Sequence, residues 1–275
     1  MQTIQLDHAS LTRIGYADVP IPAHDVGLSP SDFAGLSWRE PAWSEGQQVR
    51  VGAAAWLAEV ADKRIVFDPV QAADGVLRAD LNAELLHQSA FADLCAGAGF
   101  PRESVDLVVL SHIEDVGMVG WRGEDGHWSP FFPNARILLS AAALQALEAS
   151  GGDAGLQPVS AAWRAFIDGD RVGTFADGEV LAPGLVAEVR GGHGPGHAIL
   201  HFGEDPLRAQ LTMIGHLALS PIHLATGECA RMHEDAATAW EQLQRIAADG
   251  RILVGSLWPA PAHGRWINGA FVPGT

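Results

Sequence analysis

The stretch VDLVVLSHIEDVGMVGW, residues 105–121, decides how the rest of the chain is interpreted. Residues 105–110 are mostly apolar and rich in valine, which predicts a short buried strand. Ser111 and His112 follow directly, and then two acidic residues and two glycines, which predicts a loop at the end of that strand. Loops held by a rigid scaffold carry much of protein chemistry, so this loop is the first candidate for a functional site.

The composition predicts a globular chain with a sizeable core. Of its 275 residues, 48% are hydrophobic and 18% charged, which is not the balance of a disordered chain. The formal net charge is −16, which disfavours nucleic acid and anionic membranes as partners. Cys95 and Cys229 are the only cysteines and lie far apart, which argues against a disulfide framework and a thiolate zinc site. The N-terminus has no signal-peptide pattern and no apolar run could span a bilayer, so we expect a cytoplasmic protein.

The pattern of apolar residues predicts strands in both halves of the chain, each half with helices of its own. We therefore expect an α/β fold with helices outside packed sheets, formed by residues 1–275 as a single domain. The predicted strands are residues 4–16, 53–60, 64–68, 105–110, 136–140, 185–189, 198–202, 210–214 and 251–254, with a closing Asn-Gly hairpin over 266–271. The predicted helices are residues 82–98, 141–149, 161–166 and 235–248.

Residues 20–47 contain several prolines and two tryptophans, Trp38 and Trp43, and predict an irregular excursion with turns. Such a segment can form a lid or a contact in a homodimer. A surface loop that packs its tryptophans against the core explains the same pattern equally well.

Two further histidine segments lie at predicted strand ends. His193 belongs to GGHGPGH, residues 191–197, before one strand, and His216 ends IGH, residues 214–216, after another. Together with His112 and Glu114 they offer imidazoles and a carboxylate from three strand–loop junctions. Imidazole with carboxylate is ligand chemistry that suits zinc, iron or manganese. Spacing alone leaves open whether these side chains converge.

Over residues 50–275 the chain resembles the metallo-β-lactamase superfamily, especially its lactonase and organophosphate-hydrolase-like branch. The first metal loop of that superfamily follows a strand like residues 105–110 and has the pattern [ST]-H-x-H-x-D-H-x-G. Further matches follow in the family's order: FPNAR at 132–136, APG at 182–184, and HGPGH at 193–197 for its H-T-P-G-H loop. The resemblance implies an αββα sandwich of two packed mixed sheets, with a metal cleft at one edge.

The departures from the family pattern define the predicted site. His112 and His193 keep their ligand positions, Glu114 stands where the second histidine belongs, and His216 stands where an aspartate normally bridges two metals. Val116, Gly117 and Leu257 replace the residues that usually complete the second metal position. We therefore expect one divalent metal ion, held by His112, Glu114, His193 and His216. A slipped alignment exchanges the roles of Glu114 and Asp115, and the acid that is not a ligand is the predicted general base. Asp115 is the first choice for that role.

Three functions are compatible with such a site. The first is a metallohydrolase that uses metal-bound hydroxide on an ester, a lactone or a similar small-molecule substrate, with zinc as the first choice of metal and iron or manganese as alternatives. The second is a mononuclear iron oxygenase or lyase-like enzyme. The third is a non-catalytic protein that keeps the cleft for ligand binding.

Four other residues have supporting or uncertain roles on the same resemblance. Asp68 matches a family aspartate and is predicted to hold the metal loop by hydrogen bonds. His197 is predicted to support the loop next to the metal ligands. His223 and His263 either line the cleft or are surface histidines, and we expect the surface location for His263.

Overall fold

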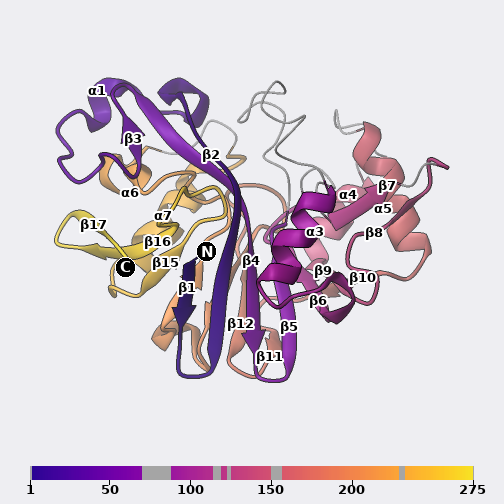
Figure 1. Cartoon of the computed structure of the whole chain (residues 1–275). Coiled ribbons are helices and arrows are strands. Elements are labelled where there is room, and N and C mark those ends of the chain that lie inside the picture. Colours follow the sequence, from indigo (N-terminus) through magenta and orange to yellow (C-terminus); the bar gives the residue numbers. More distant parts are fainter. Residues whose placement is uncertain are drawn as a thin grey trace.

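The computed structural model describes residues 2–69, 88–113, 119–122, 125–149, 157–228 and 233–274. In this part of the chain two sheets pack face to face, with helices on their outer sides (Figure 1). The rings of Phe67, from the first sheet, and Phe202, from the second, meet between them with centroids 5.7 Å apart. The arrangement is the predicted α/β, αββα sandwich of two mixed sheets.

The first sheet has eight strands among the described residues, in the order β1-β2-β4-β5-β6-β9-β10, with β3 paired to β4. Its strands β5, β6, β9 and β10 run parallel to one another. The strands are β1 (Gln2–Gln5), β2 (Ala9–Pro22), β3 (Ser44–Glu45), β4 (Gln48–Val60), β5 (Lys63–Phe67), β6 (Leu107–Val109), β9 (Arg136–Ser140) and β10 (Val172–Phe175).

The second sheet has seven described strands in sequence order, from β11 to β17, and only its pair β14–β15 is parallel. Its strands are β11 (Val180–Ala182), β12 (Leu185–Val189), β13 (Ala198–Phe202), β14 (Leu211–Met213), β15 (Ile252–Val254), β16 (His263–Ile267) and β17 (Ala270–Pro273). A separate pair joins β7 (Gly120–Arg122) to β8 (Trp128–Pro130). As predicted, β16 and β17 form a hairpin, and its turn residues Asn268 and Gly269 both have positive φ.

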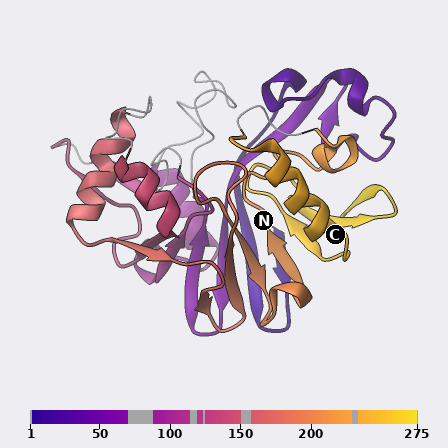
Figure 2. The same ribbon diagram turned by 180° about the vertical axis from the view of Figure 1, so that it is seen from behind.

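The helices follow the predicted apolar faces. The helix α7 (Ala236–Ala247) begins where the Asp235 side chain accepts a hydrogen bond from the Thr238 N–H, and it buries Leu243 and Ile246. Figure 2 shows α7 lying across the second sheet. The other helices are α1 (Pro30–Phe33), α3 (Gln88–Gly97), α4 (Ala141–Ala149), α5 (Gln157–Asp168), α6 (Ile222–Thr226) and the short 3-10 helices η1 (Ala23–Val26), η2 (Arg102–Ser104) and η4 (Pro206–Arg208). The predicted helix 161–166 is thus part of a longer one, and residues 82–87 of another lie outside the described residues.

The N-terminal region differs from the prediction. Residues 4–16 are not one strand, because the chain turns between β1 and β2, where the Leu6 N–H bonds to the Ala9 carbonyl. The strand β2 then continues through Pro20 and Pro22, although prolines were expected to end it. Among the described residues, β1 pairs only with residues 10–13 of β2, so the C-terminal part of β2 is paired with β4 on one side and has no neighbouring strand on the other. On such an edge a proline need not remove a hydrogen bond of the sheet.

The excursion that follows β2 packs its tryptophans inward. Trp43 is completely buried, and its ring lies 5.7 Å from the ring of Trp258 and 5.3 Å from that of Phe271. Trp38 lies against Trp266. The two tryptophans thus pack against the core, as one interpretation of residues 20–47 predicts, and the lid or homodimer contact stays a prediction. Truncating a buried tryptophan of this kind to alanine costs about 3–5 kcal/mol.

No helix within the described residues is long and apolar enough to cross a membrane.

Candidate metal centre

The three predicted histidine ligands follow strands that end at the same edge of the sandwich. His112 follows β6, His193 lies in the loop from β12 to β13, and His216 follows β14. In the second sheet β12 and β14 are both antiparallel to β13, so they run in the same direction and end at the same edge, which places His193 and His216 there. His112 joins them from the end of β6 in the first sheet.

The structure brings the three imidazoles together. One ring nitrogen from each of His112, His193 and His216 lies within 4.8 Å of the others. The ring centroids are 4.6 Å apart for His112 and His193, 4.3 Å for His112 and His216, and 5.2 Å for His193 and His216. All three side chains are buried. Glu114 and Asp115 lie outside the described residues, as do Val116 and Gly117, so their roles remain predictions.

The chemistry of the three imidazoles fits a metal ion. Burial, and then the neighbouring imidazoles of His112 and His216, lower the pKa of His193 far below its usual value, so this ring is neutral. Its Nδ1 atom is buried and has no hydrogen-bond partner among the described residues. Native proteins rarely leave a buried polar atom unpaired, so the environment of this ring is unusual. Neutral imidazole nitrogens gathered within ligand distance are the donors that divalent transition metals prefer.

A network of hydrogen bonds through Ser111 and Asp68 fixes the ring of His112. Asp68 accepts hydrogen bonds from the Ser111 N–H at 2.7 Å, from the Ser111 hydroxyl at 2.9 Å and from the Ser256 hydroxyl at 2.5 Å. The Ser111 hydroxyl gives its only proton to Asp68, so it accepts from His112 Nδ1, which lies 2.9 Å away. The proton of His112 is therefore on Nδ1, and Nε2 is the nitrogen with the lone pair. The prediction that Asp68 holds the loop of Ser111 and His112 by hydrogen bonds is confirmed.

His197 and Gly215 hold the His216 loop. His197 Nε2 accepts a hydrogen bond from the His216 N–H at 3.3 Å, which confirms its predicted supporting role. Gly215 has a φ of 55°, and a Cβ atom there would lie 2.6 Å from His197 Nε2 and 2.7 Å from the Ser111 hydroxyl. Only glycine leaves room for the loop to pass this close to both residues.

Two other predicted histidines do not belong to the site. His223 is completely buried, and its two ring nitrogens lie 2.9 Å from the Val26 carbonyl and 3.0 Å from the Ser220 carbonyl, so it joins α6 to the N-terminal excursion. His263 is only 6% exposed and lies in β16, which makes its predicted surface location wrong. The strand β16 pairs with β15 on one side and β17 on the other, and this pairing buries its first residues.

One histidine near the site was missed by the sequence. The ring of His233 lies 5.2 Å from the ring of His193, and its Nε2 atom lies 3.0 Å from the Leu217 carbonyl. His233 precedes α7, has no flanking glycine and does not end a predicted strand, so no feature of the pattern drew attention to it.

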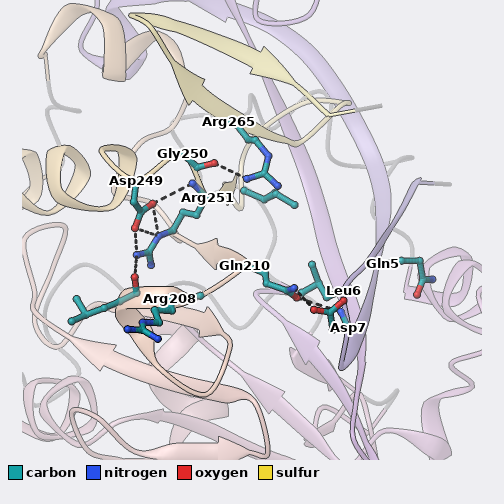
Figure 3. Close-up of a pocket in the computed structure, with 12 residues that line it drawn as sticks. Gln5, Leu6, Asp7, Arg208, Gln210, Asp249, Gly250, Arg251 and Arg265 are labelled. Atoms are coloured by element: carbon teal, nitrogen blue, oxygen red, sulfur yellow. Dashed lines mark hydrogen bonds and ion pairs between the residues drawn. The ribbon is translucent and has the colours of Figure 1, made fainter.

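A separate cavity of about 440 Å³ lies at the opposite edge, where β14 and β15 begin (Figure 3). Its polar side chains are bonded to one another. Asp7 and Gln210 exchange hydrogen bonds across the two sheets, Arg251 binds Asp249, and Arg265 donates to the Gly250 carbonyl. The contact of Asp7 with Gln210 joins the two sheets, and the other two contacts hold the segment before β15 in place.

No protein-family model matches this sequence, and neither does any curated protein. Solved structures do match over nearly the whole chain. The hydrolase AbOPH of the beta-lactamase superfamily has 15% sequence identity and a TM-score of 0.75, covering 99% of this chain and 97% of its own. AidC, a dizinc quorum-quenching lactonase, has 16% identity and a TM-score of 0.72, covering 100% of this chain and 97% of its own. A probable metal-dependent hydrolase from Staphylococcus aureus has 13% identity and a TM-score of 0.67, covering 92% of this chain and 91% of its own.

The chain therefore has the metallo-β-lactamase fold. The comparison agrees with the motifs of residues 105–121 and 193–197, which led to the same fold from the sequence.

Proposed function

We propose that the chain is a divergent metallo-β-lactamase-superfamily enzyme, a hydrolase with one divalent metal ion. The observation that carries this proposal is the cluster of three buried imidazoles, one ring nitrogen from each within 4.8 Å of the others. Hydrolases and a lactonase with the same fold support the reaction class. The substrate class we propose is an ester, a lactone or a similar small molecule with a carbonyl group.

Each residue of the proposed site has a defined task. His112, His193 and His216 would hold the ion, with Glu114 as a fourth ligand from the same loop as His112. When bound, such an ion polarises a carbonyl group and brings the pKa of a bound water molecule to about 7. Asp68 accepts the hydroxyl proton of Ser111, which keeps the ring proton of His112 on Nδ1 and the lone pair on Nε2, where it would bind the ion. Asp115 would take a proton from the attacking water, and it exchanges this task with Glu114 if Asp115 is the ligand.

The absence of the usual second-metal residues supports a single ion. Leu257, which stands at the position of the family's last histidine, is 3% exposed and carries no donor atom. With one ion, hydrolysis lacks the second positive charge that clamps the attacking oxygen in two-metal sites. We therefore expect slower turnover than in dinuclear hydrolases.

The test is a metal count and an activity assay on protein purified without added metal. We expect one zinc ion per chain by elemental mass spectrometry, together with hydrolysis of p-nitrophenyl esters or simple lactones. Glu114→Ala is expected to abolish metal uptake, whereas Glu103→Ala, which removes an exposed acid on η2, leaves it unchanged. Stoichiometric iron with oxygen-dependent turnover contradicts the hydrolase and favours redox chemistry. Absence of metal at full stability contradicts both enzymatic functions.

A further inference from the structure

The segment before α7 is attached to the loop that carries His193. The Glu234 N–H donates to the His193 carbonyl at 3.2 Å, and the Asp235 N–H donates to the Gly192 carbonyl at 2.9 Å. The loop also lies directly against α7, since a Cβ atom on Gly192 would be 3.0 Å from the Ala239 backbone nitrogen. These backbone contacts of residues 234, 235 and 239 hold His233 beside His193.

The hydrogen bond to Leu217 fixes the tautomer of His233. Its Nε2 atom lies 3.0 Å from the Leu217 carbonyl, and a carbonyl oxygen can only accept, so Nε2 carries the proton. The lone pair of the ring is consequently on Nδ1. This Nδ1 atom is buried and has no hydrogen-bond partner among the described residues.

His193, by contrast, lacks a hydrogen-bond acceptor for its Nδ1 atom among the described residues. Its Nδ1 is also buried without a partner in the described part of the chain, and the two rings are 5.2 Å apart, edge to face at 81°. If His193 binds a metal ion through Nε2, its Nδ1 must carry a proton and becomes a donor. Metal-binding histidines almost always donate this second N–H to a nearby acceptor. The terminal side-chain torsion of histidine is broad, so each ring can turn about its Cβ–Cγ bond.

We propose that His233 is a positioning residue for the metal centre, whose Nδ1 accepts a hydrogen bond from Nδ1–H of the metal-binding His193. Because His233 also donates to the carbonyl of Leu217, the residue after His216, it ties together two of the three ligand loops. This inference rests on the proposed metal site. It assigns a specific function to a residue that does not itself bind the ion.

Two substitutions separate the acceptor from the rest of the side chain. In His233→Gln the amide nitrogen takes the place of Nε2, so the bond to Leu217 is kept and the Nδ1 acceptor is lost. In His233→Asn the amide oxygen takes the place of Nδ1, so the acceptor is kept and the bond to Leu217 is lost. His263→Gln is the matched control, since His263 is buried, its Nδ1 has no partner among the described residues, and it lies in β16 and is not a member of the three-histidine cluster.

The measurement is Co²⁺ affinity, by competition with a chromophoric chelator, together with the d–d absorption spectrum of the Co²⁺ protein and thermal unfolding without metal. We expect His233→Gln to weaken Co²⁺ binding by about 10- to 100-fold and to change the spectrum, as loss of an outer-shell partner does. The Co²⁺ affinity of His233→Asn is expected to stay within about threefold of that of the original chain, because this variant keeps the acceptor. His263→Gln is expected to bind Co²⁺ unchanged.

Two results would overturn the positioning role. One is a His233→Gln protein that binds Co²⁺ as tightly as the original chain. The other is equal loss in the Gln and Asn variants with equal loss of thermal stability, which shows that the side chain only supports the fold. If the original chain itself binds no Co²⁺, the proposed metal site fails along with this inference. If the original chain binds the metal and hydrolyses its substrate, and His233→Gln does so equally well, only the positioning role of His233 is contradicted and the proposed metal site stands.

Discussion

The two edges of the sandwich both bury polar side chains, but these side chains differ in how completely they are hydrogen-bonded. At one edge, Arg251 is buried and donates to Asp249, to the Pro206 carbonyl at 2.8 Å, to the Thr212 hydroxyl at 3.1 Å and to His201 Nδ1 at 3.2 Å. His201 lies 2.8 Å from Glu188 through its other ring nitrogen. At the opposite edge, His193 and His233 each keep a buried ring nitrogen without a partner among the described residues.

The difference between the edges is one of hydrogen-bond saturation. A buried imidazole whose two nitrogens are both bonded, as in His201, stabilises the fold and has nothing left to offer a ligand. A buried imidazole with an unpaired nitrogen lowers the stability of the fold unless something binds it. Burial alone does not distinguish the two, because all of these rings are buried or nearly so. An unpaired nitrogen does not by itself make a ligand, since His263 has one among the described residues and lies outside the three-histidine cluster.

The largest expected effect is on the saturated edge. Arg251→Met removes the buried guanidinium that donates to Asp249, to the Pro206 carbonyl and to the Thr212 hydroxyl. Each acceptor that loses its partner costs about 1–3 kcal/mol, so we expect a loss of about 3–5 kcal/mol in the free energy of unfolding. Metal affinity is expected to be unchanged. Chemical denaturation measures the first quantity and chelator competition the second. The control is Arg265→Met, which removes an exposed arginine of the same cavity whose hydrogen-bond partner in the described part of the chain is the Gly250 carbonyl, so no buried ion pair is lost. Equal losses in the two variants would contradict the distinction.

His193→Ala tests the opposite edge. Zinc sites of three or four ligands bind with about 10–16 kcal/mol, so removal of one ligand is expected to cost roughly 3–4 kcal/mol, on the order of 10²- to 10³-fold in affinity. Metal binding is measured by chelator competition, with His263→Ala as a control for deletion of a buried imidazole. Unchanged affinity in His193→Ala would falsify the ligand assignment.

Asp68→Asn tests a residue that shares features of both edges. The carboxylate of Asp68 is fully hydrogen-bonded, and through Ser111 it orients the proposed ligand His112. An amide accepts through one oxygen only. Both serine hydroxyls donate to Oδ2 of Asp68 and the Ser111 N–H donates to Oδ1, so the amide NH2 group faces either the two hydroxyls or the backbone N–H. We expect metal affinity to fall by about 10- to 100-fold. The control is Asp106→Asn, an exposed aspartate before β6 that accepts from the Arg64 N–H. If the two variants bind metal equally well, Asp68 supports only the fold.

The smallest expected effect is that of Glu188→Gln, and it depends on pH. Burial raises the pKa of Glu188, but the hydrogen bond with His201 and the charge of Arg245 outweigh it and hold the pKa at about 2, against an ordinary 4.5. The folded state therefore favours the charged form. Its contribution is present above about pH 4.5 and is lost as the pH falls toward 2.

We expect Glu188→Gln to reduce the free energy of unfolding by about 1–2 kcal/mol at pH 7. The difference from the original chain should shrink below pH 4.5, the ordinary pKa of this group. Denaturant titrations between pH 7 and pH 3 measure it. Glu179→Gln serves as the control, since Glu179 is exposed and accepts from the Ala176 N–H. A difference that does not depend on pH would show that the charge of Glu188 is not what stabilises the network.

The sequence predicted most of the sandwich because its strands carry a clear apolar pattern. It also predicted the three clustered histidines, since each follows or precedes such a strand at a glycine-containing loop. His233 could not be found this way, because its place beside His193 depends on backbone contacts between residues about 40 positions apart in sequence. The burial of His263 and the passage of β2 through its prolines likewise depend on which strands pair, and a single-sequence pattern does not carry that information.

His112 comes from the first sheet, and His193 and His216 come from the second. Any ion that binds all three is therefore a cross-link between the two halves of the chain, and it binds the folded chain far better than the unfolded one. By thermodynamic linkage, an ion at 100 times its dissociation constant raises the free energy of unfolding by about 2.7 kcal/mol. The melting temperature of this protein, followed against metal concentration, thus reports which ion the site prefers before any substrate is known.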